Sequence, residues 1–163
     1  MNFLSWNCRV LGNPQIVQRL CWLVKQKRSS MIFLMETKLR KKKMESIRLQ
    51  VGFPNMLVMD CVGRNGGLSL LWGNEIEVEI QNYSHHHINS VAKIPSSVIT
   101  QWKFSGFYGH LDPMKRHEGW ALLKYLKQMD LDPWVCFGDF NKILFSSNKL
   151  RSEEHTSELQ SLV

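Results

Sequence analysis

The chain has 163 residues, 44% of them hydrophobic, and 21 lysines and arginines against 14 acidic residues give it a formal charge of +7. This length suits one domain, and this apolar content argues against a disordered chain. The longest apolar run, "MIFLM" at 31–35, is too short to span a bilayer, and no secretory signal begins the sequence.

The first part of the sequence alternates between strand and helix patterns. It predicts a strand at 2–7, a helix at 14–28, a strand at 31–36 and a helix at 40–51. Asn13 and Pro14 provide a side-chain N-cap and a proline at the first helical position. The later helix places Met44, Ile47 and Val51 on one side and basic residues on the other.

After Gly52 the apolar pattern changes to a period of two. Strands are predicted at 55–60, 68–72, 76–80, 87–94, 101–109 and 133–140, with a glycine-rich turn at 63–67 and another turn at 95–98. Asp112 and Pro113 begin a further helix, whose apolar stripe comprises Trp120, Leu123, Leu126 and Met129. This order predicts an α/β (α+β) domain with mixed sheets.

Histidine and cysteine residues give no metal-site pattern. Residues 85–87 are consecutive histidines, which alternate faces on a strand and so cannot converge on one ion, and we interpret them as a surface stretch. His110 and His117 carry no partner signal. Cys8, Cys21, Cys61 and Cys136 form no CxxC pair and lie in apolar surroundings, which favours reduced thiols in an intracellular protein.

The composition changes abruptly at the C-terminal tail. Residues 151–161, "RSEEHTSELQS", are polar and acidic, and they resemble the translation of a common sequencing adapter. We therefore interpret 1–150 as the domain and 151–163 as an artefactual or disordered tail, and exclude the tail from fold reasoning. A natural disordered tail is the alternative.

Five motifs occur in order: "SWNCRVLGN" at 5–13, "FLMETK" at 33–38, "GRNGGLSLLW" at 63–72, "FSGFYGH" at 104–110 and "GDFN" at 138–141. Each is weak alone, but together they resemble the endonuclease/exonuclease/phosphatase superfamily. More narrowly, residues 1–150 resemble the apurinic-type endonuclease domain of plant LINE-type (non-LTR) retrotransposons. The resemblance implies a four-layer sandwich of two mixed β-sheets flanked by helices, with about the N-terminal half to two-thirds present.

The resemblance also implies a metal site. Hydrolysis of a phosphodiester needs a metal to polarise the phosphate and a carboxylate to orient or deprotonate water. Glu36, at the end of a buried strand, would bind Mg²⁺ or Mn²⁺. Its alternative is a surface carboxylate that caps a helix.

Four further residues would complete the chemistry that this resemblance implies. Asp139 would orient or activate the water, and Asn141 would hydrogen-bond a phosphate oxygen, unless the two form only an Asx turn. Asn7 would orient the nucleophilic site or the residues that support the metal ligands, unless it is an N-cap or turn residue. Tyr108 would contact the phosphate or the leaving group, unless it is an amphipathic residue at the core edge.

A basic segment follows Glu36 and would contact phosphates of DNA. Its residues are Lys38, Arg40, Lys41, Lys42 and Lys43, and Arg64 in the glycine turn could also meet DNA. The alternative interpretation is a solvated helix face.

Two departures from the family pattern affect the functional prediction. Val10 stands where the family favours glycine, and a positive φ there would strain a β-branched residue. The family's C-terminal Ser-Asp-His segment has no counterpart after Asn141, because His155 lies in the tail. The chain is therefore predicted to derive from a DNA-nicking endonuclease of the nucleus, joined in the parent element to a reverse transcriptase, but to be inactive as written. The alternatives are a truncated remnant with weak electrostatic DNA binding, or an enzyme acting on inositol phosphates, lipids or RNA.

Overall fold

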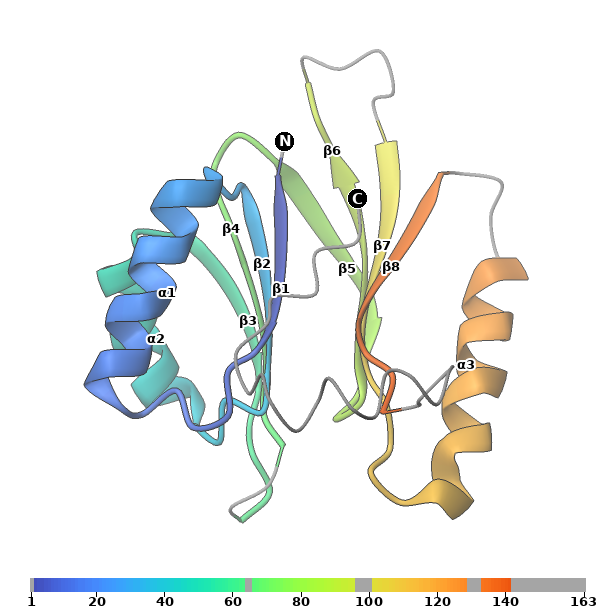
Figure 1. The fold of residues 1–163 in the computed structure, drawn as a ribbon. Coiled ribbons are helices and arrows are strands. Elements are labelled where there is room, and N and C mark those ends of the chain that lie inside the picture. Colours follow the sequence, from blue (N-terminus) through green and yellow to red (C-terminus); the bar gives the residue numbers. More distant parts are fainter. Residues whose placement is uncertain (1, 64–65, 96–100, 129–132, 142–163) are drawn as a thin grey trace.

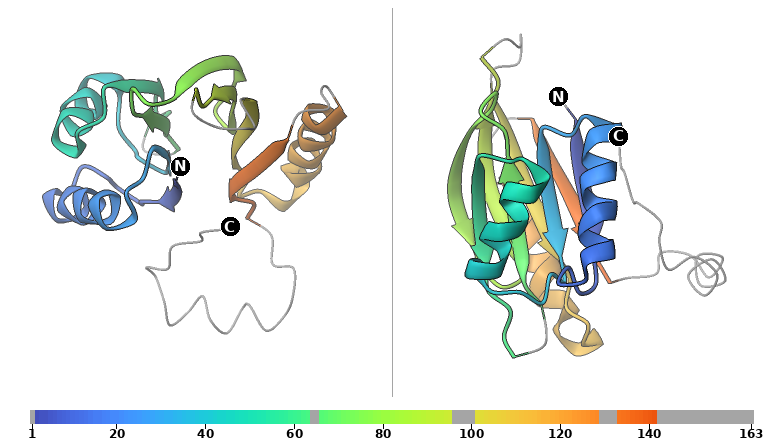
Figure 2. Two further views of the ribbon diagram at one scale, coloured as in Figure 1. Left: turned by 90° about the horizontal axis from the view of Figure 1, so that it is seen from above. Right: turned by 90° about the vertical axis from the view of Figure 1, so that its left-hand side faces the viewer.

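The computed structural model describes residues 2–63, 66–95, 101–128 and 133–141. Two four-stranded sheets face each other, with two helices on the outer side of the first sheet and one helix beyond the second (Figures 1 and 2). The predicted class, an α+β sandwich of two mixed sheets flanked by helices, is confirmed.

The first sheet contains β1 (Phe3–Asn7), β2 (Met31–Met35), β3 (Asn55–Met59) and β4 (Leu68–Trp72), in the order β1-β2-β4-β3. Helices α1 (Pro14–Lys27) and α2 (Lys41–Val51) cover it. Strands β1 and β2 are parallel because α1 returns the chain between them, whereas β4 is antiparallel to both β2 and β3.

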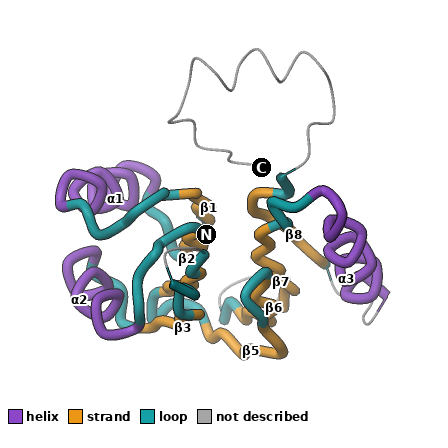
Figure 3. Tube along the Cα trace, turned by 90° about the horizontal axis from the view of Figure 1, so that it is seen from below, coloured by secondary structure: helices purple, strands orange, loops and turns teal. Residues whose placement is uncertain are grey.

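The second sheet contains β5 (Glu77–Tyr83), β6 (His87–Lys93), β7 (Gln101–Tyr108) and β8 (Trp134–Asp139), in chain order. The 3₁₀ turn η1 (Pro113–Lys115) and helix α3 (Arg116–Gln128) connect β7 to β8, which run parallel. The carboxyl ends of β1, β2, β7 and β8 consequently lie at one end of the molecule, the end that faces the viewer in Figure 3.

Apolar side chains fill the space between the sheets. The rings of Phe33 on β2 and Phe137 on β8 meet edge to face with centroids 5.6 Å apart, and Phe104 on β7 is also buried. All five residues of β2 are buried because the helices cover one face of the strand and the second sheet covers the other. The carboxyl end of β2 is therefore held between the helices and the second sheet.

The first two helices are capped in different ways. The Oδ1 of Asn13 accepts a hydrogen bond from Gln15 N at 2.9 Å, which confirms the predicted cap of α1. Arg40, at the N-cap of α2, gives no side-chain cap, and Asp60 Oδ1 instead accepts from Lys41 N at 2.7 Å. A residue distant in sequence therefore satisfies the start of α2.

Three expectations about individual residues need correction. His87 is buried, not part of a surface stretch, because Ser84 and Asn82 hydrogen-bond both of its ring nitrogens. Trp120 is 37% exposed and stacks on Phe140 instead of lying fully in the core. The four cysteines are free thiols, but only Cys8 is fully buried.

Some predictions concern residues that the structure does not describe, including Arg64, Met129 and the tail at 151–163. Among the described helices, none is both long enough and apolar enough to cross a membrane.

Candidate active site

Glu36 follows β2 directly and has a left-handed backbone conformation, with φ of 53°. Its carbonyl accepts a hydrogen bond from Val10 N at 3.1 Å. Val10 itself has φ of 74°, so the predicted backbone strain at this β-branched residue is present. A left-handed non-glycine residue is costly, and such residues concentrate at functional sites.

Asn7, at the end of β1, connects two acidic side chains from different sheets. Its Nδ2 donates to Glu36 Oε1 at 3.0 Å and to Asp139 Oδ2 at 3.2 Å. Its Oδ1 is buried and has no hydrogen-bond partner in the structure. Asn7 is therefore placed to orient both acidic groups, and the residue that caps α1 is Asn13.

Tyr108 ends β7 and reaches the same carboxylate across the sandwich. Its hydroxyl donates to Glu36 Oε1 at 2.8 Å. Burial raises the pKa of Tyr108 well above its usual value, and the hydrogen bond to Glu36 and the charges of Glu36 and Asp139 raise the pKa further. The hydroxyl therefore remains a proton donor at every pH near neutrality.

Asp139 ends β8, and Gly138 determines how it is presented. Gly138 has φ of 143°, and a Cβ added there would overlap the carbonyl oxygen of Phe107 on the neighbouring strand. The next hydrogen bonds fix the turn: Gly109 N donates to Asp139 O at 2.7 Å, and Asn141 N donates to Asp139 Oδ1 at 2.9 Å. An Asx turn is thus present, but it leaves the second carboxylate oxygen of Asp139 directed at Asn7.

Asn141 lies at this turn, and its side chain makes a hydrogen bond within the protein. Its Nδ2 donates to Gly109 O at 2.6 Å. This bond joins the turn after β8 to the end of β7. One of the two N–H groups of the Asn141 side chain therefore donates within the protein, and the other has no part in this bond.

The chemistry of these donors fits a hard divalent cation. Two carboxylates share one amide nitrogen, which cannot neutralise either charge, and a buried amide oxygen beside them lacks a partner. Carboxylate and amide oxygens are the ligands that Mg²⁺ and Mn²⁺ prefer. Among the described residues, no group of three or more histidine, cysteine, aspartate or glutamate side chains could hold a metal. The described part of the chain would therefore supply only a few of the ligands of such an ion.

The basic segment lies beside this site but outside its hydrogen-bond network. Lys38 is half-buried and also left-handed, with φ of 54°, two residues after Glu36. Arg40 and the three lysines that begin α2 are exposed. Cations at the N-terminus of a helix oppose the helix dipole, at a cost of about 0.3–1 kcal/mol each.

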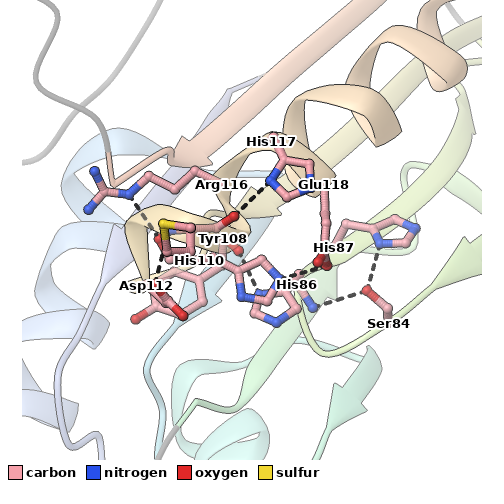
Figure 4. A network of polar contacts seen from close by, with 10 residues as sticks. Ser84, His86, His87, Tyr108, His110, Asp112, Arg116, His117 and Glu118 are labelled. Carbon is pink, nitrogen blue, oxygen red and sulfur yellow. Dashed lines mark hydrogen bonds and ion pairs between the residues drawn. The ribbon is translucent and has the colours of Figure 1, made fainter.

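A histidine that the sequence did not suggest holds Tyr108 in place. Tyr108 N donates to His86 O at 2.7 Å, and His86 Nδ1 lies 3.1 Å from Tyr108 O (Figure 4). The ring of His86 also lies against that of His110 at a tilt of 34°, with centroids 3.7 Å apart. Strand pairing between β6 and β7 creates this contact, and no local sequence signal marks it.

The arrangement of two facing mixed sheets flanked by helices also occurs in solved structures. Solved structures with this fold include an AP endonuclease from Archaeoglobus fulgidus, with a TM-score of 0.63 and 18% identity over 93% of this chain and 63% of that chain. The fold is that of the endonuclease/exonuclease/phosphatase superfamily.

Two further structures extend the comparison. A 3′ phosphatase from Neisseria bound to a product DNA hairpin has a TM-score of 0.63 and 16% identity, covering 94% of this chain and 63% of that one. The endonuclease domain of TRAS1, a telomere-specific non-LTR retrotransposon, has a TM-score of 0.62 and 10% identity, covering 88% and 61%. The chain thus spans less than two thirds of these proteins. No family model and no curated protein matches the sequence.

Proposed function

We propose that this chain carries part of the active site of a divalent-metal-dependent phosphodiesterase that acts on DNA as an endonuclease. The observation that supports it most is the convergence of Glu36, Asp139, Asn7 and Tyr108, which come from four strands of two sheets. The shared fold supports the same class of reaction.

The side chains have separate roles in this proposal. Glu36 and Asp139 would hold Mg²⁺ or Mn²⁺, which supplies charge neutralisation and polarises the phosphate. Asn7 keeps the two carboxylates together. Asp139 would also orient the attacking water, and Tyr108, which stays protonated, would donate toward a phosphate or leaving-group oxygen.

The basic segment supports DNA as the substrate. Lys41, Lys42 and Lys43 occupy the end of α2 where cations are unfavourable, so the fold itself gains nothing from them. A phosphate backbone would be attracted both by these charges and by the helix N-terminus. This placement favours DNA binding over the alternative of a merely solvated helix face.

The motif resemblance and the likeness to the TRAS1 domain support a narrower proposal. The parent would be a LINE-type retrotransposon protein of plant type that nicks target DNA in the nucleus. The nick would provide a primer end for a reverse transcriptase in the same polypeptide. Arg64 would add a DNA contact in this scheme.

We further propose that the 163-residue chain does not nick DNA by itself. In the described part of the chain, two carboxylates converge, and no histidine is hydrogen-bonded to Asp139. The alternative is a non-catalytic remnant of such an enzyme that binds nucleic acid weakly through its positive charge. It differs from the proposed phosphodiesterase only in lacking a functional metal site.

The predicted lack of nicking is tested by incubating supercoiled plasmid with the chain and Mg²⁺ or Mn²⁺. No nicking is expected. Nicking that disappears in Glu36→Gln would contradict the predicted inactivity and support the assigned site.

Affinity for duplex DNA should fall as salt rises, with a shallower slope when Lys41, Lys42 and Lys43 are changed to glutamine. Absence of affinity at low salt would contradict the DNA proposal.

A further inference from the structure

Met35 is the last residue of β2 and directly precedes Glu36. Its side chain is buried in the core between the two sheets, in the same cluster as Tyr108 and Phe137. The backbone nitrogen of Asp139 donates a hydrogen bond to the Sδ of Met35 at 3.2 Å. This bond joins the residue before one candidate metal ligand to the backbone of the other ligand, which lies in the facing sheet (Figure 1).

The backbone of Met35 is itself held in place by the neighbouring strand β1. The carbonyl oxygen of Met35 accepts from Cys8 N at 3.0 Å and from Cys8 Sγ at 3.1 Å. Cys8 directly follows Asn7, whose side chain binds both acidic groups. The sulfur of Met35 is therefore attached to a fixed point of the first sheet.

The backbone of Asp139 is held from two directions. Its carbonyl oxygen accepts from Gly109 N at 2.7 Å within the second sheet, and its N–H donates to Met35 Sδ in the first sheet. Among the described strands, β8 lies at the edge of its sheet and pairs with β7 alone. Pairing within the second sheet cannot set the distance between Asp139 and the first sheet, whereas the bond to Met35 crosses between the sheets.

Packing alone does not require a sulfur atom at position 35. Leucine and methionine have similar volumes and replace each other in cores at little cost. Met31 lies on the same face of β2 and is also buried, but among the described residues no donor is hydrogen-bonded to its sulfur. A thioether is a weak acceptor. At position 35 it receives the N–H of a candidate metal ligand, which distinguishes this methionine from Met31.

We propose that Met35 is a positioning residue, which holds Asp139 beside Glu36 so that both carboxylates can bind one divalent cation. This inference rests on the proposed function and adds to it a restraint that passes through the core. Asn7 connects the two carboxylates through their oxygens, and Met35 connects the backbones that carry them. Groups that orient metal ligands in this way contribute to metal affinity without touching the metal.

Mn²⁺ binding by the full chain, measured by electron paramagnetic resonance, tests the inference with two matched variants. Met35→Leu should weaken Mn²⁺ binding about three- to tenfold, because the sulfur acceptor is lost while the volume is kept. Met31→Leu is the control and should keep the affinity within about twofold of wild type. Urea denaturation of both variants confirms that they are folded.

Hydrogen exchange followed by nuclear magnetic resonance gives a second readout that needs no metal. In the metal-free chain, the amide proton of Asp139 should exchange at least about threefold faster in Met35→Leu. Its exchange rate should be unchanged in Met31→Leu. Met35→Ile, which also lacks the sulfur, provides the same comparison if the leucine variant does not fold.

Three results would overturn the inference: an unchanged Mn²⁺ affinity in Met35→Leu, an equal loss in Met31→Leu, or an Asp139 amide that does not respond to loss of the sulfur. The proposed function would stand in each case, provided that the wild-type chain binds Mn²⁺ and Glu36→Gln weakens this binding. A wild-type chain that binds no Mn²⁺ would overturn both.

Discussion

The hydroxyl of Tyr108 donates a hydrogen bond to Oε1 of Glu36 at 2.8 Å, across 72 positions of sequence. The same carboxylate oxygen accepts from Asn7, so one acidic group is bound from its own sheet and from the facing sheet. The site therefore exists only when both sheets have formed and packed together. Stability and site geometry are consequently linked.

Removal of this hydroxyl should measure that link. Tyr108→Phe is expected to lower the free energy of unfolding by about 1–2 kcal/mol, because a hydrogen bond to a charged group is lost while the ring remains packed. Urea denaturation followed by tryptophan fluorescence gives the value. Tyr83→Phe is the control, since Tyr83 is 54% exposed on β5. Equal effects in both variants would refute a specific role for the Tyr108 hydroxyl.

Gly138 should tolerate no side chain. Its φ of 143° is unfavourable for other residues, and a Cβ would overlap Phe107 O, which belongs to the backbone of β7. Gly138→Ala should therefore cost about 2–4 kcal/mol or prevent folding. Gly12→Ala is the control, because a Cβ there meets only Leu39 Cδ2 at an ordinary 3.5 Å. Far-UV circular dichroism and urea denaturation would show a mild Gly138→Ala phenotype if this explanation is wrong.

Charge reversal at the start of α2 should separate stability from DNA binding. Lys42→Glu and Lys43→Glu are each expected to stabilise the fold by about 0.3–1 kcal/mol, because acidic residues suit a helix N-terminus. The same changes should weaken DNA binding and reduce its salt slope. Lys127→Glu, in the last turn of α3, should do the reverse: lower stability with DNA affinity retained. A loss of stability in the α2 variants would contradict the dipole argument.

The cysteines should differ in reactivity. Burial raises the pKa of the Cys8 and Cys136 thiols to about 12, so both stay protonated at pH 8. Cys21, Cys61 and Cys136 are all half-buried, so the raised pKa alone separates Cys136 from the other two. A thiol reagent should therefore label Cys21 and Cys61 in the folded chain, and Cys8 and Cys136 only in urea. Rapid native labelling of Cys8, located by peptide mass spectrometry, would show that β1 opens easily.

Local pattern predicted most elements of this fold, because strand and helix periods are encoded by nearby residues. The helix beginning at Pro14 and the buried strand at 31–35 follow from capping chemistry and from a continuous apolar run. Sheet order did not follow, since β4 inserts between β2 and β3 through long-range pairing. His87 looked exposed in a polar stretch, but Asn82 and Ser84 satisfy its ring and allow burial.

In the candidate site, too, some features follow from local sequence and others depend on long-range contacts. The motif resemblance selected Asn7, Glu36, Tyr108 and Asp139, and the structure brings these four together. The partners of Asn141 depend on a contact between β7 and the turn after β8, which no local pattern contains.

Binding of Mn²⁺ by the folded chain, measured by electron paramagnetic resonance, tests the central claim most directly because it does not depend on catalysis. We predict one site, weakened at least about tenfold by Glu36→Gln or Asp139→Asn. Glu77→Gln, an exposed carboxylate on β5, should leave the affinity unchanged. Absence of Mn²⁺ binding, or an affinity indifferent to Glu36 and Asp139, would contradict the assignment of these residues as a metal site.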